Sequence, residues 1–293
     1  MPSWCPRPLF MFPFSLLSCG RGALMRLQDK VIVVTGSTRG IGRAISLACA
    51  REGASVVISS RSAEAVQKTV DAMKAQGYAA SGITCDITVP GALGELLRFA
   101  VTTFGKVDVW INNAGLSSGY RPLEEMNPDE ISRVVATNVT ALATGCSIVI
   151  PWMRAHGGGI VINMSGRGGK GEPSPWTALY AATKAAVTSL TQSLATENKG
   201  SNVSIHAVIP GMVATDFYNN ITTSPRCSGE LDNLPLVLDA FGVPLDVVGQ
   251  GFVDIAAQEP GRETGQVYNL LHGRRLSRGI LKMTYARMTH RLK

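Results

Sequence analysis

A tyrosine and a lysine four positions apart form the pair in this sequence whose types and spacing could move a proton. Tyr180 and Lys184 lie in the segment LYAATK. In a helix this spacing puts both side chains on one face, one turn apart, so an ammonium can stabilise a phenolate. A free phenol has a pKa of about 10, and a neighbouring cation lowers that pKa towards neutral pH. The pair therefore indicates a tyrosine that acts as an acid or a base.

A glycine-rich turn near the start of the chain could hold a pyrophosphate. The segment TGSTRGIG, residues 35–42, stands between an apolar run, Val31–Thr35, and a helical pattern, Arg43–Glu52. In a strand, glycine turn and helix, backbone amides at the helix N-terminus can contact phosphate oxygens with no side chain in the way. The predicted cofactor contacts in this turn are Gly36, Ser37, Arg39, Gly40, Ile41 and Gly42.

The end of the next apolar run, Ser55–Ser60, indicates which dinucleotide is bound. Ser60 and Arg61 stand where a dinucleotide fold places a carboxylate for the adenosine ribose of NAD. No acid stands there, and Arg39 adds a second guanidinium from the glycine turn. Guanidinium groups bind phosphate in bidentate fashion, so these residues favour NADP over NAD.

These groups need a scaffold in which strands and helices alternate. The predicted strands are Val31–Thr35, Ser55–Ser60, Ala80–Cys85, Val107–Ile111, Gly159–Met164, Val203–Ile209 and Val267–Leu271. The predicted helices are Arg43–Glu52, Ala63–Gln76, Ala92–Phe104, 128–154 and 177–197. This alternation predicts an α/β fold of the Rossmann type, a doubly wound parallel β-sheet with helices on both faces, in a single domain. Ligands of such a fold bind beyond the carboxyl ends of the strands.

Polar and small residues follow the predicted strands at those ends. Asp86 and Ile87 come after the third strand, where an adenine could be hydrogen-bonded. The other residues at strand ends are Asn113, Ala114, Gly115, Ser165, Pro210 and Gly211. Asn138 lies in the middle of the predicted helix 128–154, where a polar amide is usually a capping or core residue.

Together these motifs resemble the short-chain dehydrogenase/reductase family over about residues 28–272. They are, in chain order, TGSTRGIG at 35–42, Asp86, NNAG at 112–115, Asn138, Ser165, YAATK at 180–184 and PGMVAT at 210–215. The resemblance implies an NADP(H)-dependent oxidoreductase that transfers hydride between nicotinamide and a carbonyl or alcohol, with Tyr180 as proton donor or acceptor. It implies that Lys184 holds the nicotinamide ribose, Ser165 hydrogen-bonds the substrate oxygen, and Asn138 holds a water in the proton relay. Further cofactor contacts implied by the last motif are Met212, Val213 and Thr215, with Pro210 and Gly211.

The segment between Ser165 and Tyr180 is longer than the family spacing. The extra length lies in GRGGKGEPSPW, and together with VWINNAG and PGMVATD it resembles the chlorophyll(ide) b reductase branch, which reduces a formyl group on a tetrapyrrole. Reductases of 3-oxoacyl thioesters share most of these residues and stay an alternative. A catalytically silent NADP-binding sensor is the alternative outside enzymes, and the presence of all four proton-transfer residues argues against it.

Ala214–Gly242 is where such enzymes place a substrate lid. Five apolar residues would give that lid an apolar inner face and imply a hydrophobic substrate; they are Leu234, Leu236, Val237, Leu238 and Phe241. The alternative, that these side chains simply cover the sheet, is equally consistent with the sequence.

The net charge of +7 is concentrated in the last part of the chain. The seven basic residues after Glu263 are Arg274, Arg275, Arg278, Lys282, Arg287, Arg291 and Lys293, and no acid accompanies them. The body is therefore nearly neutral, which argues against a nucleic-acid-binding domain. Residues 279–293 mix these charges with apolar residues, so they could form a membrane-surface helix, a partner-docking helix or a frayed tail. We expect a frayed or loosely docked basic tail over 273–293.

The remaining composition defines the domain and its surroundings. With 293 residues, 45% of them hydrophobic, the chain can bury one large core, which we place at 25–272. Six scattered cysteines with no CxxC motif indicate reduced thiols and no metal site. By resemblance, the partners are a small-molecule carbonyl or alcohol substrate and a second copy of the chain, in a homodimer or homotetramer.

Residues 1–24 differ from the rest because no acid occurs before Asp29. The apolar run Leu9–Leu17 has the outline of a secretory signal but is too short to span a bilayer. We interpret 1–24 as an upstream extension, with Met25 as a plausible alternative start and an organelle transit peptide as the second interpretation. These interpretations predict a cytoplasmic protein without a transmembrane segment, or alternatively one of an organelle such as a plastid.

Overall fold

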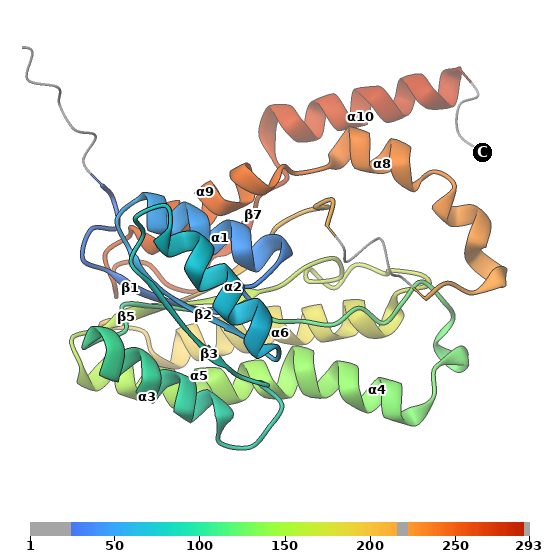
Figure 1. Ribbon diagram of the computed structural model, residues 1–293. Helices are drawn as coiled ribbons and strands as arrows, with labels where there is room; N and C mark the ends of the chain where they lie inside the picture. Colours follow the sequence, from blue (N-terminus) through green and yellow to red (C-terminus); the bar gives the residue numbers. More distant parts are fainter. Residues whose placement is uncertain (1–24, 216–221, 290–293) are drawn as a thin grey trace, which may run out of the picture.

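A parallel sheet between two layers of helices forms the body of the protein (Figure 1). The computed structural model describes residues 25–215 and 222–289. The strands are β1 (Val31–Thr35), β2 (Ser55–Ser60), β3 (Ala80–Thr84), β4 (Val109–Asn112), β5 (Gly159–Met164), β6 (Val203–Ile209) and β7 (Val267–Asn269). Their order is β3-β2-β1-β4-β5-β6-β7, and every pair is parallel. The predicted doubly wound α/β fold is confirmed.

Helices cover both faces of this sheet. The α-helices of the described chain are α1 (Gly40–Arg51), α2 (Ala63–Lys74), α3 (Ala92–Phe104), α4 (Pro128–Val135), α5 (Ala141–Ala155), α6 (Ala178–Glu197), α8 (Leu234–Phe241), α9 (Leu245–Ala256) and α10 (Gly273–Met288). Helices α1, α2 and α9 pack with one core cluster, and α3, α5 and α6 pack with the other. Adjacent residues of β1 enter opposite clusters, which is why this strand is apolar throughout instead of alternating.

The predicted helix 128–154 is interrupted by a short π-helical turn. The turn spans Ala136–Thr140 between α4 and α5 and contains Asn138. The apolar pattern continues through the turn, so periodicity alone could not show it. The whole stretch Pro128–Ala155 is apolar and long enough to cross a membrane, yet half of its most apolar window is buried inside the fold. We therefore assign it to the helical layer that covers the sheet.

A buried chain of hydrogen bonds joins α6 to the middle of the sheet. Trp110 Nε1 donates to Asn112 Oδ1 over 2.8 Å, and Asn112 Nδ2 donates to Asn163 Oδ1 over 2.9 Å. Asn163 Nδ2 in turn donates to Thr191 Oγ1 over 3.0 Å. Because all four side chains are buried, each unpaired polar atom would cost free energy, and the network selects one placement of α6.

The basic end of the chain is more ordered than its composition suggests. The part expected to be frayed or loosely docked is helical through Met288, as α10, and packs on α8. Gly279 makes this close approach feasible, because a Cβ atom there would lie 2.4 Å from the Phe241 ring. Four cysteines in the described residues are free and buried: Cys49, Cys85, Cys146 and Cys227. The predictions for 1–24, 216–221 and 290–293 fall outside the described residues.

The histidine in the middle of β6 has no hydrogen-bond partner among the described residues. Both ring nitrogens of His206 are buried and unpaired, and the ring lies edge-on to Tyr268 with centroids 5.4 Å apart. Burial lowers the pKa of His206 from 6.5 to about 4. The native protein therefore keeps this imidazole neutral at pH values at which the unfolded chain protonates it.

This difference predicts a pH-dependent part of the stability. Between pH 7 and pH 5 the unfolded state gains the proton and the native state does not, so the free energy of unfolding falls by about 2 kcal/mol on account of His206. His206→Leu should remove that share of the pH dependence, measured by urea unfolding at the two pH values. His272→Leu, at an exposed histidine, is the control and should keep it. An unchanged pH dependence in His206→Leu would contradict the assignment.

Candidate active site

A cavity of about 1210 Å³ opens along the carboxyl edge of the sheet. At this edge β1 lies between β2 and β4, so the loops after β1 and β4 diverge to opposite faces and leave a crevice. Nearly all the residues predicted to bind the cofactor line this cavity: Gly36, Arg39, Gly40, Ile41, Gly42, Ser60, Arg61, Asp86, Ile87, Asn113, Ala114, Gly115, Tyr180, Lys184, Pro210, Gly211, Met212, Val213 and Thr215. Ser165 also lines it. The fold thus brings together segments that lie far apart in the sequence.

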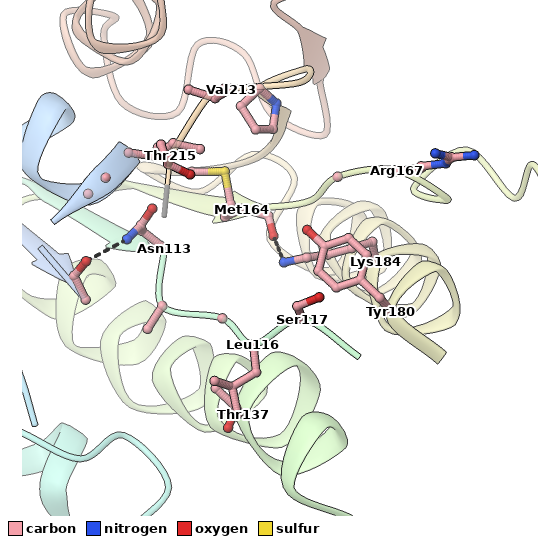
Figure 2. A pocket seen from close by; sticks show the side chains of 18 of the residues that line it. Asn113, Leu116, Ser117, Thr137, Met164, Arg167, Tyr180, Lys184, Val213 and Thr215 are labelled. Carbon is pink, nitrogen blue, oxygen red and sulfur yellow. Dashed lines mark hydrogen bonds between the residues drawn. The ribbon is translucent and has the colours of Figure 1, made fainter. Parts of the chain in front are cut away.

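The glycine turn is built to receive an anion. It leads into α1, whose N-cap residue Arg39 makes no capping hydrogen bond with its side chain. The first amides of the helix therefore stay available to a ligand, and the helix dipole favours negative charge there. Asn113 Nδ2 donates to the carbonyl oxygens of Thr35 and Gly36, over 2.8 and 3.1 Å, and holds the turn against the end of β4 (Figure 2). These features fit the pyrophosphate of a dinucleotide.

Two glycines in the turn are required by its geometry. Gly36 has φ +64°, and a Cβ atom there would lie 3.0 Å from the Ala114 side chain. A Cβ atom at Gly42 would lie only 2.4 Å from the Gly36 carbonyl oxygen. The turn therefore has no room for side chains at either position.

The prediction for Ser37 is corrected by the structure. Its side chain is fully buried, and its hydroxyl donates to the Val34 carbonyl over 2.8 Å and accepts the Ser59 amide over 2.9 Å. It therefore joins the ends of β1 and β2 and does not face the cavity. Thr38, which follows it, lines the cavity instead.

The cavity end nearest β2 is bordered by two arginines and one carboxylate. Arg39, Arg61 and Ser60 line it, as does Asp86. The carboxylate of Asp86 accepts hydrogen bonds from the Thr88 amide and hydroxyl, over 3.0 and 2.7 Å. These bonds, aided by the more distant charge of Arg61, lower the pKa of Asp86. Asp86 therefore remains an anion, and its carboxylate is bonded to Thr88 in the turn that follows β3.

The tyrosine and lysine of α6 meet as their spacing predicted. Lys184 is only 3% exposed, and its Nζ donates to the Met164 carbonyl at the end of β5 over 2.8 Å (Figure 2). Nζ lies 5.5 Å from the centroid of the Tyr180 ring. Burial lowers the pKa of Lys184 to about 8, so the side chain is still mostly an ammonium at pH 7. Such a cation beside a phenol favours the phenolate and supports proton transfer by Tyr180.

Of the other two predicted catalytic residues, Ser165 lines the cavity and Asn138 does not. Ser165 is buried at the end of β5, and its hydroxyl hydrogen-bonds the Lys184 carbonyl and the Thr188 hydroxyl, over 3.2 and 2.8 Å. Asn138 lies behind the cavity wall: its Nδ2 donates to the Leu116 carbonyl and the Thr183 hydroxyl, and its Oδ1 accepts the Leu116 amide. Both amide hydrogens are therefore used, and Asn138 holds the segment after β4 against α6. A water at Asn138, as predicted, would therefore have to donate its hydrogen bond to an oxygen of this residue.

Several cavity-lining residues were absent from the sequence-based predictions. Leu116 and Ser117 follow the NNAG motif, and Thr137 precedes Asn138; all three border the cavity (Figure 2). Each is adjacent to a predicted motif, which was the available signal. Met283 also lines the cavity, from α10, and no motif pointed to it because the contact depends on how α10 docks.

Comparison with known proteins identifies the family. The family model described as short chain dehydrogenase matches residues 30–226. A chlorophyll(ide) b reductase of rice (Oryza sativa subsp. japonica), named as chloroplastic, is 39% identical over 67% of this chain and 59% of its own length. The 7alpha-hydroxysteroid dehydrogenase of Escherichia coli K12 is 31% identical over 76% of this chain and 86% of its own length. The crystal structure of a 3-ketoacyl-(acyl-carrier-protein) reductase from Brucella melitensis, complexed with NADH, superposes with a TM-score of 0.73 at 25% identity, covering 83% of this chain and 97% of that one.

The chain belongs to the short chain dehydrogenase family, and the resemblance inferred from its motifs is confirmed. This family consists of oxidoreductases that bind a nicotinamide cofactor. The chain spans between 40% and 64% of the length of the plant chlorophyll(ide) b reductases that it matches.

The glycine turn yields a prediction with a built-in control. Gly42→Ala should weaken binding of NADPH and NADH alike by about tenfold or more. The added Cβ atom would displace the Gly36 carbonyl and so distort the turn, and overpacking of this kind typically costs about 1–3 kcal/mol of free energy. Gly94→Ala, in α3, places its Cβ atom in open space and should leave binding unchanged. Fluorescence titration measures both. Equal affinity of Gly42→Ala and wild type would show that the turn does not contact the cofactor.

Proposed function

We propose that this protein is an NADPH-dependent reductase of an apolar carbonyl compound, with the corresponding alcohol oxidation as its reverse reaction. One observation carries the proposal: a single cavity contains an arginine-bordered end, the Tyr180–Lys184 pair and an apolar end. The first fits a phosphorylated dinucleotide, the second supports proton transfer, and the third fits a hydrophobic substrate.

The choice of NADP rests on the side chains at the end of β2. Arg39, Ser60 and Arg61 line this part of the cavity, where a carboxylate would bind the ribose of NAD. The nearby carboxylate, Asp86, is held by Thr88. The solved relative from Brucella melitensis is complexed with NADH, and the proposed preference for NADP therefore rests on the two guanidinium groups of this chain.

The residues around Tyr180 divide the chemistry among them. The nicotinamide supplies the hydride when bound. Tyr180 gives its phenolic proton to the developing alkoxide, and the Lys184 ammonium stabilises the phenolate that remains. Ser165 donates to the substrate oxygen after its hydroxyl hydrogen turns away from the Lys184 carbonyl and the Thr188 hydroxyl. Asn138 acts through Leu116, because it positions the segment that borders the cavity.

The substrate end of the cavity is lined by a helix of the predicted lid. Leu234, Val237 and Phe241 of α8 line the cavity together with Met283 of α10. This arrangement supports the lid interpretation over the alternative that these residues only cover the sheet. Residues 216–221 of the predicted lid lie outside the described residues.

A formyl group on a tetrapyrrole is the specific substrate we propose to test first. The lengthened segment between Ser165 and Tyr180 and the similarity to plant chlorophyll(ide) b reductases both favour it.

Some relatives are named as chloroplastic, which makes a plastid a candidate location beside the predicted cytoplasm. A homodimer or homotetramer, the family expectation, is tested by light scattering.

A substrate screen with NADPH tests the proposed function. We expect turnover of a formyl-bearing chlorophyllide or, in its place, of an apolar ketone or a β-ketoacyl thioester. On the best substrate, Tyr180→Phe should lower kcat by about 10²–10⁴-fold, because the proton donor is lost, while NADPH affinity stays within a few-fold. Tyr268→Phe, away from the cavity, is the control and should retain kcat. Substantial activity in Tyr180→Phe would exclude the assigned donor.

The cofactor preference is tested by charge reversal. Arg61→Asp should lower kcat/KM for NADPH by about 10- to 100-fold, because a guanidinium–phosphate contact is replaced by repulsion. The same variant should improve the relative use of NADH. Arg262→Asp, at an exposed arginine outside the cavity lining, should change neither. An unchanged preference in Arg61→Asp would assign the phosphate to Arg39 or another group.

A further inference from the structure

Helix α10 has an inward face that packs against α8. Gly279 and Ala286 are buried on it, and Gly279 abuts Phe241 of α8. Lys282 Nζ donates to Asp239 Oδ2 over 2.9 Å and so adds an ion pair between the two helices. This face fixes the orientation of α10, which lies along the border of the molecule beside α8 (Figure 1).

The outward face of α10 carries large apolar side chains that no described residue covers. Leu281, Tyr285 and Met288 are 71%, 60% and 75% exposed. Their spacing of i, i+4 and i+7 places them in one stripe, on the side opposite Gly279 and Ala286. A cluster of exposed apolar residues of this kind marks a surface that contacts another body.

The charges of α10 indicate what that body is. The helix carries five basic side chains, Arg274, Arg275, Arg278, Lys282 and Arg287, and no acidic one. By helical spacing, Arg274 and Arg278 lie on the same side as Leu281, seven and three positions before it. The partner must therefore be both apolar and anionic. A second α10 would place like charges against each other, which argues against a symmetric contact between two copies.

We propose that the outward face of α10 docks this protein on an anionic lipid surface. Leu281, Tyr285 and Met288 insert among the acyl chains and headgroups, while Arg274 and Arg278 contact lipid phosphates. A bilayer meets both requirements without any fixed shape, and a tyrosine suits its interface because the ring is apolar and the hydroxyl polar.

The position of this face relates it to the cavity. Met283 of α10 and Leu234, Val237 and Phe241 of α8 line the apolar end of the cavity. Docking through α10 therefore brings that end close to the membrane, where an apolar substrate concentrates. This consequence rests on the proposed function, whereas the docking itself does not depend on any reaction.

Vesicle binding tests the proposal without requiring turnover. The full chain is sedimented with vesicles of phosphatidylcholine alone and with vesicles that also contain phosphatidylglycerol. We expect binding to the mixed vesicles that weakens as salt is added. Arg274→Gln with Arg278→Gln should weaken it about 25-fold, from roughly fivefold for each basic side chain near an anionic surface. Leu281→Gln with Met288→Gln should weaken it by tenfold or more.

Matched variants elsewhere on the surface provide the controls. Lys68→Gln with Lys74→Gln removes the same charge from the exposed side of α2, and Val89→Gln with Leu123→Gln removes exposed apolar side chains away from α10. Both pairs should bind vesicles like the wild type. Circular dichroism melts of all variants confirm that they are folded.

Three results would overturn the proposal. They are no sedimentation with phosphatidylglycerol vesicles, equal loss of binding in the control pairs, and self-association that Leu281→Gln with Met288→Gln abolishes in the absence of any vesicle binding. The last result would assign the face to a second copy of the chain. None of them depends on whether the reductase reaction occurs.

Discussion

The buried ammonium of Lys184 is the interaction on which the site depends. A charge at this depth is tolerated only where a hydrogen-bond acceptor meets it, and the carbonyl of Met164 does so at the end of β5. The contact ties the first turns of α6 to the carboxyl edge of the sheet. Tyr180, one turn earlier on the same helix, is thereby held at the cavity with a cation beside its ring.

The surrounding structure supports that one contact from both sides. Beneath it, the buried chain from Trp110 to Thr191 aligns β4, β5 and α6. Beside it, Asn138 joins the π-helical turn to Leu116 and Thr183. A π-helical turn replaces some of the regular hydrogen bonds of an α-helix. Here the turn contains Asn138, whose side-chain amide makes these contacts. These contacts position the side chains around Tyr180 in advance, and proton transfer over a short distance requires such positioning.

The sequence predicted the sheet and a large part of the cavity lining because both follow local patterns. Strands such as β5 and β6 are apolar runs with clear ends, and cavity residues such as Asn113 and Gly211 follow directly after strands. The features that were not predicted depend on contacts between segments that lie far apart in the sequence. Ser37 faces the sheet because its hydroxyl bonds the Ser59 amide, and α10 is ordered because Gly279 packs against Phe241. No motif or hydrophobic period within one segment reveals such a contact.

The central claim is that hydride and proton reach one carbonyl group at the Tyr180–Lys184 pair. The most direct measurement uses NADPH deuterated at the transferring position of C4, an apolar aldehyde or ketone, and mass spectrometry of the alcohol. The account predicts one deuterium on the former carbonyl carbon for each cofactor oxidised, with the hydroxyl proton coming from solvent. Tight NADPH binding without deuterium transfer to any carbonyl compound tested would contradict it and identify a nucleotide-binding protein that has no reductase activity.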